Sequence, residues 1–288
     1  MDTKKIWFVT GASKGLGLSL IKQLLQAGYK VAAASRKAKD IEDVITIHKE
    51  NLLALTVDIT DETSVNGAIT KTIAHFGQLD VVVNNAGYSI HGSVEALSNE
   101  EFRKTIDVNL FGTVNVIRAA MPYLRKQRSG YIFNISSVAG YKGFGNSPSY
   151  AAGKFAVIGL SESLAEEVKQ FGVKVTVVAP GFFRTSFLDK GDELVSKNTI
   201  EEYQVEGLVD RLRAMNGKQP GDPEKLVAAI INLSNEKKPP VHLLMGPDAY
   251  QIVMQKRTAE QHEFEAWKEL TLSTDLDEDQ KAESPKFS

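Results

Sequence analysis

Short apolar segments alternate with longer helical patterns along the first 180 residues of this 288-residue chain. The apolar segments lack the polar alternation of half-exposed strands, which is typical of a parallel sheet covered by helices on both faces. Repetition of strand and helix in this order predicts an α/β fold with a doubly wound parallel sheet, the Rossmann type, in a single domain. The predicted strands are residues 5–10, 30–34, 52–57, 79–84, 130–136 and 173–179.

Helical patterns lie between these strands. One covers residues 61–76, and another covers 98–109 and opens with Ser98 and Glu101 as a capping box. Longer helices are expected at 99–127 and 149–171.

The alternation stops after residue 180. Residues 182–220 are mixed and mostly helical in pattern, and we expect them to form a lid over a substrate. A helix at 222–234 and a seventh strand at 241–245 then complete the sheet, so the single domain is expected to span 1–246. Residues 247–288 are expected to form a terminal helix to about 270, followed by a disordered acidic tail. The apolar residues that could dock this helix are Ile252, Val253, Phe264, Trp267 and Leu270.

The composition excludes several classes of protein. With a net charge of −2 and no basic stripe, the chain is not expected to bind nucleic acid. Its lack of cysteine excludes disulfides, thiolate metal sites and a cysteine nucleophile. The five histidines lack ligand spacing, so no metal is expected. No segment reaches the roughly 18 apolar residues of a membrane span, and the first residues are not typical of a signal peptide, so we expect a cytoplasmic protein without a membrane partner.

A glycine-rich segment, residues 10–17 (TGASKGLG), separates the first predicted strand from the first predicted helix. Glycines in this position allow a sharp turn and bring backbone N–H groups close to a pyrophosphate, while the positive end of the helix faces the anion. A plain tight turn between strand and helix is the alternative. The position directly after the first strand favours a dinucleotide site.

The end of the second predicted strand indicates which dinucleotide. An NAD site places a carboxylate there to hold the ribose 2′-hydroxyl. Here the residues are Ser35, Arg36 and Lys37, and Lys14 in the glycine-rich segment adds a further cation. A guanidinium is well suited to a 2′-phosphate. A solvated surface patch is the alternative, but the pattern favours NADP(H) as the cofactor.

Tyr150 and Lys154 lie four residues apart at the start of a predicted helix, so both side chains share one face. An ammonium beside a phenol stabilises the phenolate and lowers its pKa, which would make Tyr150 an acid–base group able to protonate a carbonyl oxygen. Polar residues also end two strands, at 84–87 (NNAG) and 134–137 (NISS). Ligands bind at this carboxyl edge in such sheets, so a shared crevice is expected.

These motifs together resemble the short-chain dehydrogenase/reductase family over residues 5 to about 246. The segment TGASKGLG has the family's TGxxxGxG spacing, NNAG fits at 84–87, and Tyr150 with Lys154 completes YxxxK. The resemblance selects Ser137, thirteen residues before Tyr150, as the catalytic serine, and Asn109 as the asparagine of the catalytic tetrad. It also implies cofactor contacts from Gly11, Ser13, Lys14, Gly15, Leu16, Gly17, Ser35, Arg36, Lys37, Asp58, Ile59, Asn85, Ala86, Gly87, Tyr150, Lys154, Pro180, Gly181, Phe183 and Thr185.

The resemblance implies a role for each member of the tetrad. Tyr150 would be the acid–base, Ser137 would bind the substrate oxygen, Lys154 would bind the nicotinamide ribose, and Asn109 would sustain a water-linked proton path. Phe183 departs from the family, in which a smaller aliphatic residue is common there. Similar proteins associate through the helices expected at 99–127 and 149–171, so a homodimer or homotetramer is expected. The apolar residues that suggest this contact are Phe111, Val114, Ile117, Phe155, Ile158 and Leu160, although these could simply pack on the sheet.

The leading hypothesis is an NADP-dependent oxidoreductase that passes a hydride between the nicotinamide and a carbonyl or alcohol substrate. A catalytically idle nucleotide-sensing or scaffold protein on the same fold is the alternative, and the intact tetrad argues against it. A sugar-nucleotide isomerase or dehydratase is disfavoured by the glycine spacing. The expected pocket is apolar, with Arg184 as its evident charge, which favours hydrophobic ketones, aldehydes or secondary alcohols. Its expected lining is Tyr88, Ile90, Val138, Tyr141, Phe144, Phe182, Phe187 and Met215.

Overall fold

The computed structural model describes residues 4–188 and 195–276. Within these residues one seven-stranded sheet has the strand order β3-β2-β1-β4-β5-β6-β7, and every neighbouring pair is parallel. The strands are β1 Ile6–Thr10, β2 Lys30–Ser35, β3 Leu52–Thr56, β4 Val81–Asn84, β5 Gly130–Ile135, β6 Val173–Pro180 and β7 His242–Met245. All seven strands predicted from the sequence are therefore confirmed, each within two residues.

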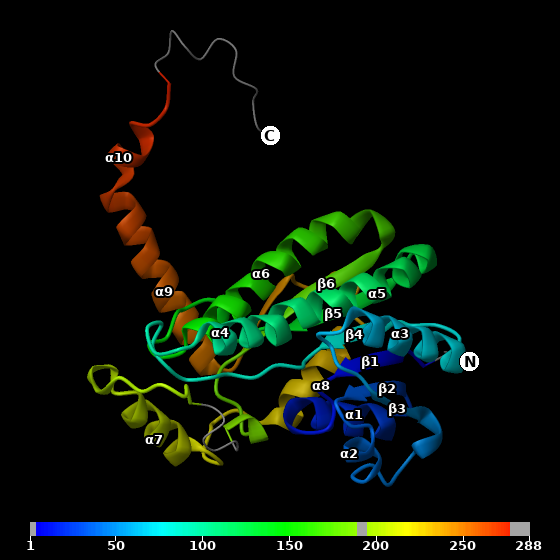
Figure 1. Ribbon diagram of the computed structural model, residues 1–288. Coiled ribbons are helices and arrows are strands. Elements are labelled where there is room, and N and C mark those ends of the chain that lie inside the picture. Colours follow the sequence, from blue (N-terminus) through cyan, green and yellow to red (C-terminus); the bar gives the residue numbers. More distant parts are fainter. Residues whose placement is uncertain (1–3, 189–194, 277–288) are drawn as a thin grey trace.

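Helices cover both faces of this sheet (Figure 1). On one face, Trp7 and Val9 of β1 pack with residues of α1 and α8, among them Leu24 and Ile230. On the other face, Phe8 packs with residues of α3, α5 and α6. The helices are α1 Gly15–Gln26, α2 Lys39–Glu42, α3 Glu62–Phe76, α4 Asn99–Ile106, α5 Gly112–Gln127, α6 Pro148–Val168, α7 Val205–Met215, α8 Pro223–Leu233, α9 Pro247–Ala266 and α10 Lys268–Leu272.

Helix α4 begins with the predicted capping box. The Ser98 hydroxyl accepts a hydrogen bond from the Glu101 backbone at 3.2 Å, and the Glu101 carboxylate accepts one from the Ser98 backbone at 2.9 Å. The helix then continues into α5 through a π-helical turn, Asp107–Phe111, which contains Asn109. Such turns are rare inside helices and are frequent at functional sites.

The segment expected as a lid, 182–220, is partly helical in its described residues. It contains short 3₁₀ turns at Ser186–Leu188 and Glu201–Tyr203, followed by α7. Residues 195–203 are fastened to the loop after β4 and to α4: the Ser196 backbone donates to the His91 carbonyl at 2.8 Å, and the Lys197 backbone donates to Glu101 at 2.9 Å. The middle of the expected lid, 189–194, lies outside the described residues.

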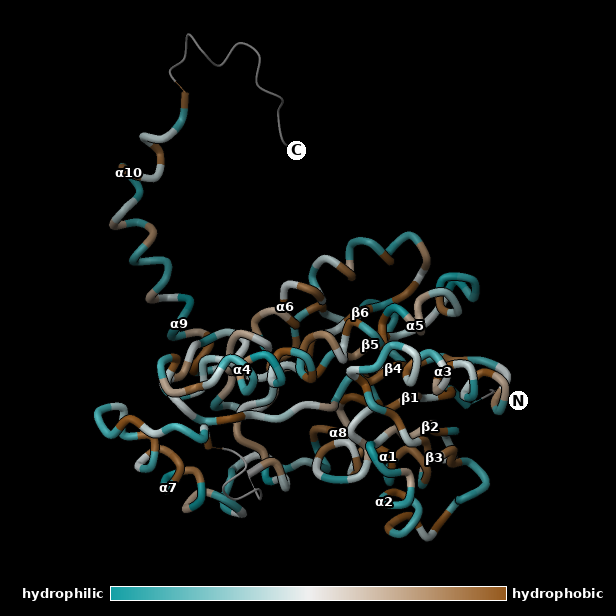
Figure 2. The backbone as a smooth tube through the Cα atoms, in the orientation of Figure 1, coloured by the Kyte–Doolittle hydropathy of each residue, from teal (hydrophilic) through white to brown (hydrophobic). Residues whose placement is uncertain are grey.

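Helix α9 leaves the body of the molecule after its first two turns (Figure 1). Val253 is buried and Ile252 is partly buried, as expected. The expectation that Phe264, Trp267 and Leu270 dock is wrong, because these side chains are 60–69% exposed. They alternate with charged residues along α9 and α10, which gives the mixed colouring of this region in Figure 2. Residues 277–288 of the expected tail lie outside the described residues, whereas α10 continues to Leu272.

Among residues 4–188 and 195–276, no helix is both long enough and apolar enough to cross a membrane. The same part of the chain brings together no group of three His, Asp or Glu residues that could hold a metal ion.

Candidate active site

The glycine-rich turn and the NNAG turn, predicted separately, are bound to each other. The Thr10 hydroxyl accepts hydrogen bonds from the backbone N–H groups of Asn85 and Ala86, at 3.0 and 3.1 Å. The Asn85 amide donates back to the carbonyls of Thr10 and Gly11. A Cβ on Gly11, whose φ is +65°, would lie 2.9 Å from the Ala86 backbone, so this close approach requires glycine.

The first turn of α1 is suited to an anion. Its N-cap residue, Lys14, is extended and makes no side-chain cap, and no acidic residue lies in the first turn of this helix. Uncapped N–H groups and the helix dipole together favour a phosphate at this end. A cleft of about 390 Å³ opens beside it, and it is lined by Lys14, Gly15, Leu18, Ser19, Arg184, Thr185, Ser186 and Pro223. The backbone N–H groups at the start of α1 and the cleft beside them therefore fit the pyrophosphate of a dinucleotide.

The end of β2 presents two cations. Arg36 and Lys37 are exposed, while the Ser35 hydroxyl is already used, since it donates to the Lys37 carbonyl at 2.6 Å. Across the sheet edge, Asp58 accepts from the Thr60 hydroxyl and backbone at 2.7 and 2.9 Å. The Thr60 hydroxyl is the main cause that lowers the pKa of Asp58, and Arg36 adds to it. Asp58 is therefore an ionised acceptor, placed two strands away from the α1 turn. The neighbouring residue Ile59 packs its side chain on Gly112.

Asn109 is held rigidly in the π-helical turn and is 1% exposed. Its amide donates to the Tyr88 carbonyl at 2.8 Å and to the Thr105 carbonyl at 3.0 Å, and its side-chain oxygen accepts from the Tyr88 backbone at 3.2 Å. Gly87 lies between Asn109 and Lys154: a Cβ on Gly87 would overlap the Asn109 side chain and lie 3.4 Å from the Lys154 Nζ. The side chains of Asn109 and Lys154 thus both lie next to the Gly87 backbone.

Ser137, Tyr150 and Lys154 meet at the carboxyl end of β5. The Ser137 hydroxyl, which accepts from the Ala139 backbone at 3.1 Å, lies close enough to the Tyr150 phenol to lower its pKa. The buried Lys154 ammonium donates to the Ile135 carbonyl at 2.8 Å and lies 5.7 Å from the centre of the Tyr150 ring. The structure therefore brings together all four residues of the predicted tetrad.

The protonation of Tyr150 differs from the sequence-based expectation. Burial raises the pKa of Tyr150 to about 12, and the nearby Ser137 hydroxyl offsets this in part. Burial also lowers the pKa of Lys154 to about 8. The expected lowering of the Tyr150 pKa by Lys154 is therefore wrong: the loss of hydration around the phenol dominates, and Ser137 rather than Lys154 opposes it. At neutral pH Tyr150 is a phenol that can donate a proton, and Lys154 is mostly an ammonium.

Asn84, Asn134 and Ser136, which were expected at the ligand-binding edge of the sheet, are instead buried in a polar chain. The Asn84 amide donates to Asn134 at 2.8 Å, and Asn134 donates to Ser161 of α6 at 2.9 Å. The Ser136 hydroxyl donates to the Lys154 carbonyl at 2.9 Å. These bonds tie the ends of β4 and β5 to the helix that carries Tyr150 and Lys154. The sequence shows that these residues are polar, but it does not show that their side chains point into the protein and bond to α6.

The expected substrate pocket is formed in part. Phe187, in the loop after β6, has its ring 5.9 Å from that of Tyr150. Ile90, in the loop after β4, and Val138, directly after Ser137, are buried. Tyr141 instead points toward β7, where its hydroxyl is hydrogen-bonded to His242 at 2.6 Å. Together with Phe144, Tyr141 packs beneath α9. Tyr88, Phe182 and Met215 are partly buried, and the exposed Arg184 donates to the Gln219 carbonyl at 3.2 Å.

The loop after β6 contains the remaining expected cofactor contacts. The Gly181 backbone donates to the Met245 carbonyl at 2.9 Å, which extends the pairing of β6 and β7 beyond Pro180. Thr185 lines the cleft beside α1. The Phe183 ring packs against Gly221 and against the hydrophobic core. It therefore fills space between the loop and the core.

Comparison with known proteins agrees with this geometry. The family model described as short chain dehydrogenase matches residues 5–194. The oxidoreductase BOA17 of Botryotinia fuckeliana is 36% identical over 273 residues, which cover 94% of this chain and 99% of that protein. A 3-ketodihydrosphingosine reductase of Bacteroides thetaiotaomicron is 38% identical over 247 residues, 84% of this chain and 88% of that protein.

Solved structures show the same fold. A short-chain dehydrogenase from Streptomyces avermitilis superposes with a TM-score of 0.88 at 33% identity, covering 95% of this chain and 100% of its own. ElxO, solved with NADP bound, has a TM-score of 0.70 at 31% identity, covering 84% and 96%. The chain therefore belongs to the short-chain dehydrogenase/reductase family, whose members use nicotinamide cofactors, and it is an oxidoreductase.

Proposed function

We propose that this protein is an NADP(H)-dependent reductase or dehydrogenase acting on a hydrophobic ketone, aldehyde or secondary alcohol. The observation that carries the proposal is the meeting of Asn109, Ser137, Tyr150 and Lys154 at the sheet edge that also holds the uncapped end of α1. A scaffold protein has no need of a buried ammonium, whose burial costs free energy.

The residues divide the chemistry between them. When bound, the nicotinamide supplies or accepts the hydride. The Tyr150 phenol, protonated at neutral pH, donates its proton to the substrate oxygen in the reductive direction. Ser137, which lies beside the Tyr150 phenol, holds the same oxygen as charge develops on it. The Lys154 ammonium then stabilises the phenolate that the transfer leaves behind.

NADP rather than NAD is supported by the end of β2. Arg36 and Lys37 are exposed there, and no carboxylate takes the position next to them that would hold a 2′-hydroxyl. A guanidinium binds phosphate through paired, charge-assisted hydrogen bonds. The similar protein ElxO, solved with NADP bound, is consistent with this preference.

Arg36→Asp is expected to shift the preference from NADPH toward NADH, because a carboxylate repels the 2′-phosphate and accepts from the 2′-hydroxyl. Loss of a charge-assisted phosphate contact costs about 1.5–3 kcal/mol, or roughly tenfold or more in affinity. The measurement is kcat/KM for both cofactors with one carbonyl substrate. Arg125→Asp, which makes the same charge change at an exposed position of α5, serves as the control. An unmutated enzyme that already prefers NADH would contradict the assignment.

The substrate class follows from the surroundings of Tyr150. Phe187 contacts the Tyr150 ring, and the apolar Val138 and Ile90 lie on the loops after β5 and β4. An apolar lining favours an uncharged ligand over one that must lose its hydration. The relative named as a 3-ketodihydrosphingosine reductase supports a ketone as the reacting group.

A carbonyl panel at fixed NADPH tests this function. We expect kcat/KM for aliphatic and aromatic ketones or aldehydes to exceed that for sugars and carboxylated carbonyls by roughly tenfold or more. A preference for anionic substrates would contradict the apolar pocket and would indicate that Arg184 binds the substrate. Absence of turnover with every carbonyl and alcohol tested would favour the sensing or scaffold role.

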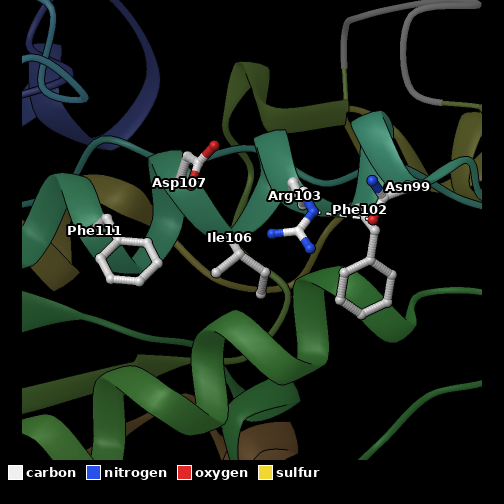
Figure 3. Close-up of a pocket in the computed structure, with 6 residues that line it drawn as sticks. All are labelled: Asn99, Phe102, Arg103, Ile106, Asp107 and Phe111. Carbon is white, nitrogen blue, oxygen red and sulfur yellow. Dashed lines mark hydrogen bonds between the residues drawn. The ribbon is translucent and has the colours of Figure 1, made fainter.

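Assembly into a homodimer or homotetramer is part of the proposal. Ile117 and Ile158 are buried in the core, but Phe111 and Phe155 are 52% and 44% exposed. Phe102, Ile106 and Phe111 project from one side of α4 and the π-helical turn (Figure 3) and line a groove of about 290 Å³. The exposed Phe111 of the π-helical turn and Phe155 of α6 support association of copies through these segments, and Asn99, Arg103 and Asp107 line the same groove beside the apolar residues. Light scattering at micromolar concentration should give a multiple of the chain mass, and the mass of one chain would contradict it.

A further inference from the structure

Helix α9 starts at the edge of the candidate active site, although it lies beyond the residues that the family model matches. Asp248, its second residue, accepts a hydrogen bond from the Phe182 backbone N–H at 2.7 Å between Oδ2 and N. Phe182 directly follows Gly181, so this carboxylate holds the turn after β6. The two residues are 66 positions apart in the chain, and no motif of the sequence connects them.

The space around the Asp248 carboxylate is made by two glycines. A Cβ on Gly181 would overlap both carboxylate oxygens of Asp248, and a Cβ on Gly246 would overlap one of them. Gly246 also has a φ of +98°, which disfavours any other residue. The turns after β6 and β7 therefore fit closely around the carboxylate.

The same end of α9 also contacts the loop on the other side of the site. Ala249 and Val253 are 0% and 2% exposed and pack against Val138, the residue that follows Ser137. The first two turns of α9 thus bridge the loop of the catalytic serine and the loop that follows β6.

We propose that Asp248 is a positioning residue that holds the loop Pro180-Gly181-Phe182 in the shape that receives the nicotinamide, which makes the start of α9 part of the hydride-transfer site. The inference rests on the proposed function, which assigns the nicotinamide to this loop. A carboxylate accepts a backbone N–H more strongly than a neutral oxygen does, so the bond fixes the loop against rotation. Misplacement of reacting atoms by about 1 Å can cost roughly 10²-fold in rate, so a small loop movement is enough to matter.

The test compares two ligands that differ only in the nicotinamide: NADP⁺ and 2′-phospho-ADP-ribose. Asp248→Ala is expected to weaken NADP⁺ binding about three- to tenfold and to lower kcat roughly tenfold or more, since it removes one charge-assisted bond. Binding of 2′-phospho-ADP-ribose should stay within about twofold. Asp248→Asn keeps an acceptor oxygen of the same reach and should restore most of the loss.

Asp80→Ala is the matched control. Its Oδ2 accepts from the Ile6 backbone at 2.7 Å, the same kind of bond, but at the amino ends of the strands. We expect it to lower stability while both ligands bind as in the unmutated protein. If Asp248→Ala does not fold, Asp248→Glu keeps the charge but displaces the oxygens, and it should show the same selective loss for NADP⁺.

The outcomes separate this inference from the proposed function. Unchanged NADP⁺ binding and kcat in a folded Asp248→Ala protein, or equal weakening of both ligands, would overturn the positioning role while leaving the cofactor assignment in place. Failure of the unmutated protein to bind either ligand would overturn the cofactor assignment and this inference with it.

Discussion

Tyr150→Phe is expected to remove most turnover, by about 10²–10⁴-fold, while NADP(H) still binds. The phenol is the group at the tetrad that both touches Ser137 and carries a proton at neutral pH, because burial raises its pKa to about 12. Phenylalanine keeps the ring and its contact with Phe187 but has no proton to donate. The loss should appear in kcat with little change in the dissociation constant of NADPH.

Tyr131→Phe provides the control for the loss of a buried phenol. Tyr131 is 3% exposed and its hydroxyl is bonded to Thr176 at 2.8 Å, within the sheet and away from Ser137. Its removal should lower the free energy of unfolding by about 1 kcal/mol without a comparable loss of kcat. Near-native kcat in a folded Tyr150→Phe protein would contradict the assignment of Tyr150 as the general acid.

The sheet could be predicted because its strands are buried on both faces and therefore appear as unbroken apolar segments. Where a strand prediction was too long, a polar contact ends the strand. Residues 79–84 were predicted as one strand, but the Asp80 carboxylate accepts from the Ile6 backbone and β4 begins at Val81. Tyr150 and Lys154 could be predicted because they lie one helical turn apart, whereas Asn109 and Ser137 were identified only through the family resemblance.

Features that depend on packing between distant segments could not be predicted. The direction of the Tyr150 pKa shift follows from burial, which four-residue spacing with Lys154 does not reveal. Tyr141 was expected in the substrate pocket, yet the short 3₁₀ turn Val138–Gly140 directs it toward His242. Apolar residues at the end of α9 suggested docking, but the helix leaves the body before it reaches Phe264.

Lys154→Met is expected to abolish most turnover and, at pH 7, to make the protein more stable. Burial lowers the pKa of Lys154 from 10.5 to about 8, so the folded protein binds this proton more weakly than the unfolded chain does. A shift of this size corresponds to about 3 kcal/mol of cost while the ammonium is charged. Methionine removes that cost but leaves the Ile135 carbonyl without its donor, and this loss destabilises the protein by about 1–2 kcal/mol. A net gain of about 1–2 kcal/mol therefore remains at pH 7.

The sign of the pH dependence distinguishes this explanation from ordinary repacking. The cost is fully present below pH 8 and declines as the pH rises from about 8 to 10.5, because the folded protein is then already deprotonated while the unfolded chain is still charged. The stability advantage of Lys154→Met over the unmutated protein should therefore shrink across that range in denaturant unfolding, and Lys71→Met, at an exposed position of α3, should change little at any pH. Reductive turnover of the unmutated enzyme should fall through the same pKa, as the ammonium that stabilises the Tyr150 phenolate is lost. A Lys154→Met protein less stable than its parent by the same amount at every pH would show that the buried charge carries no cost, and Lys154 would then be a packing residue.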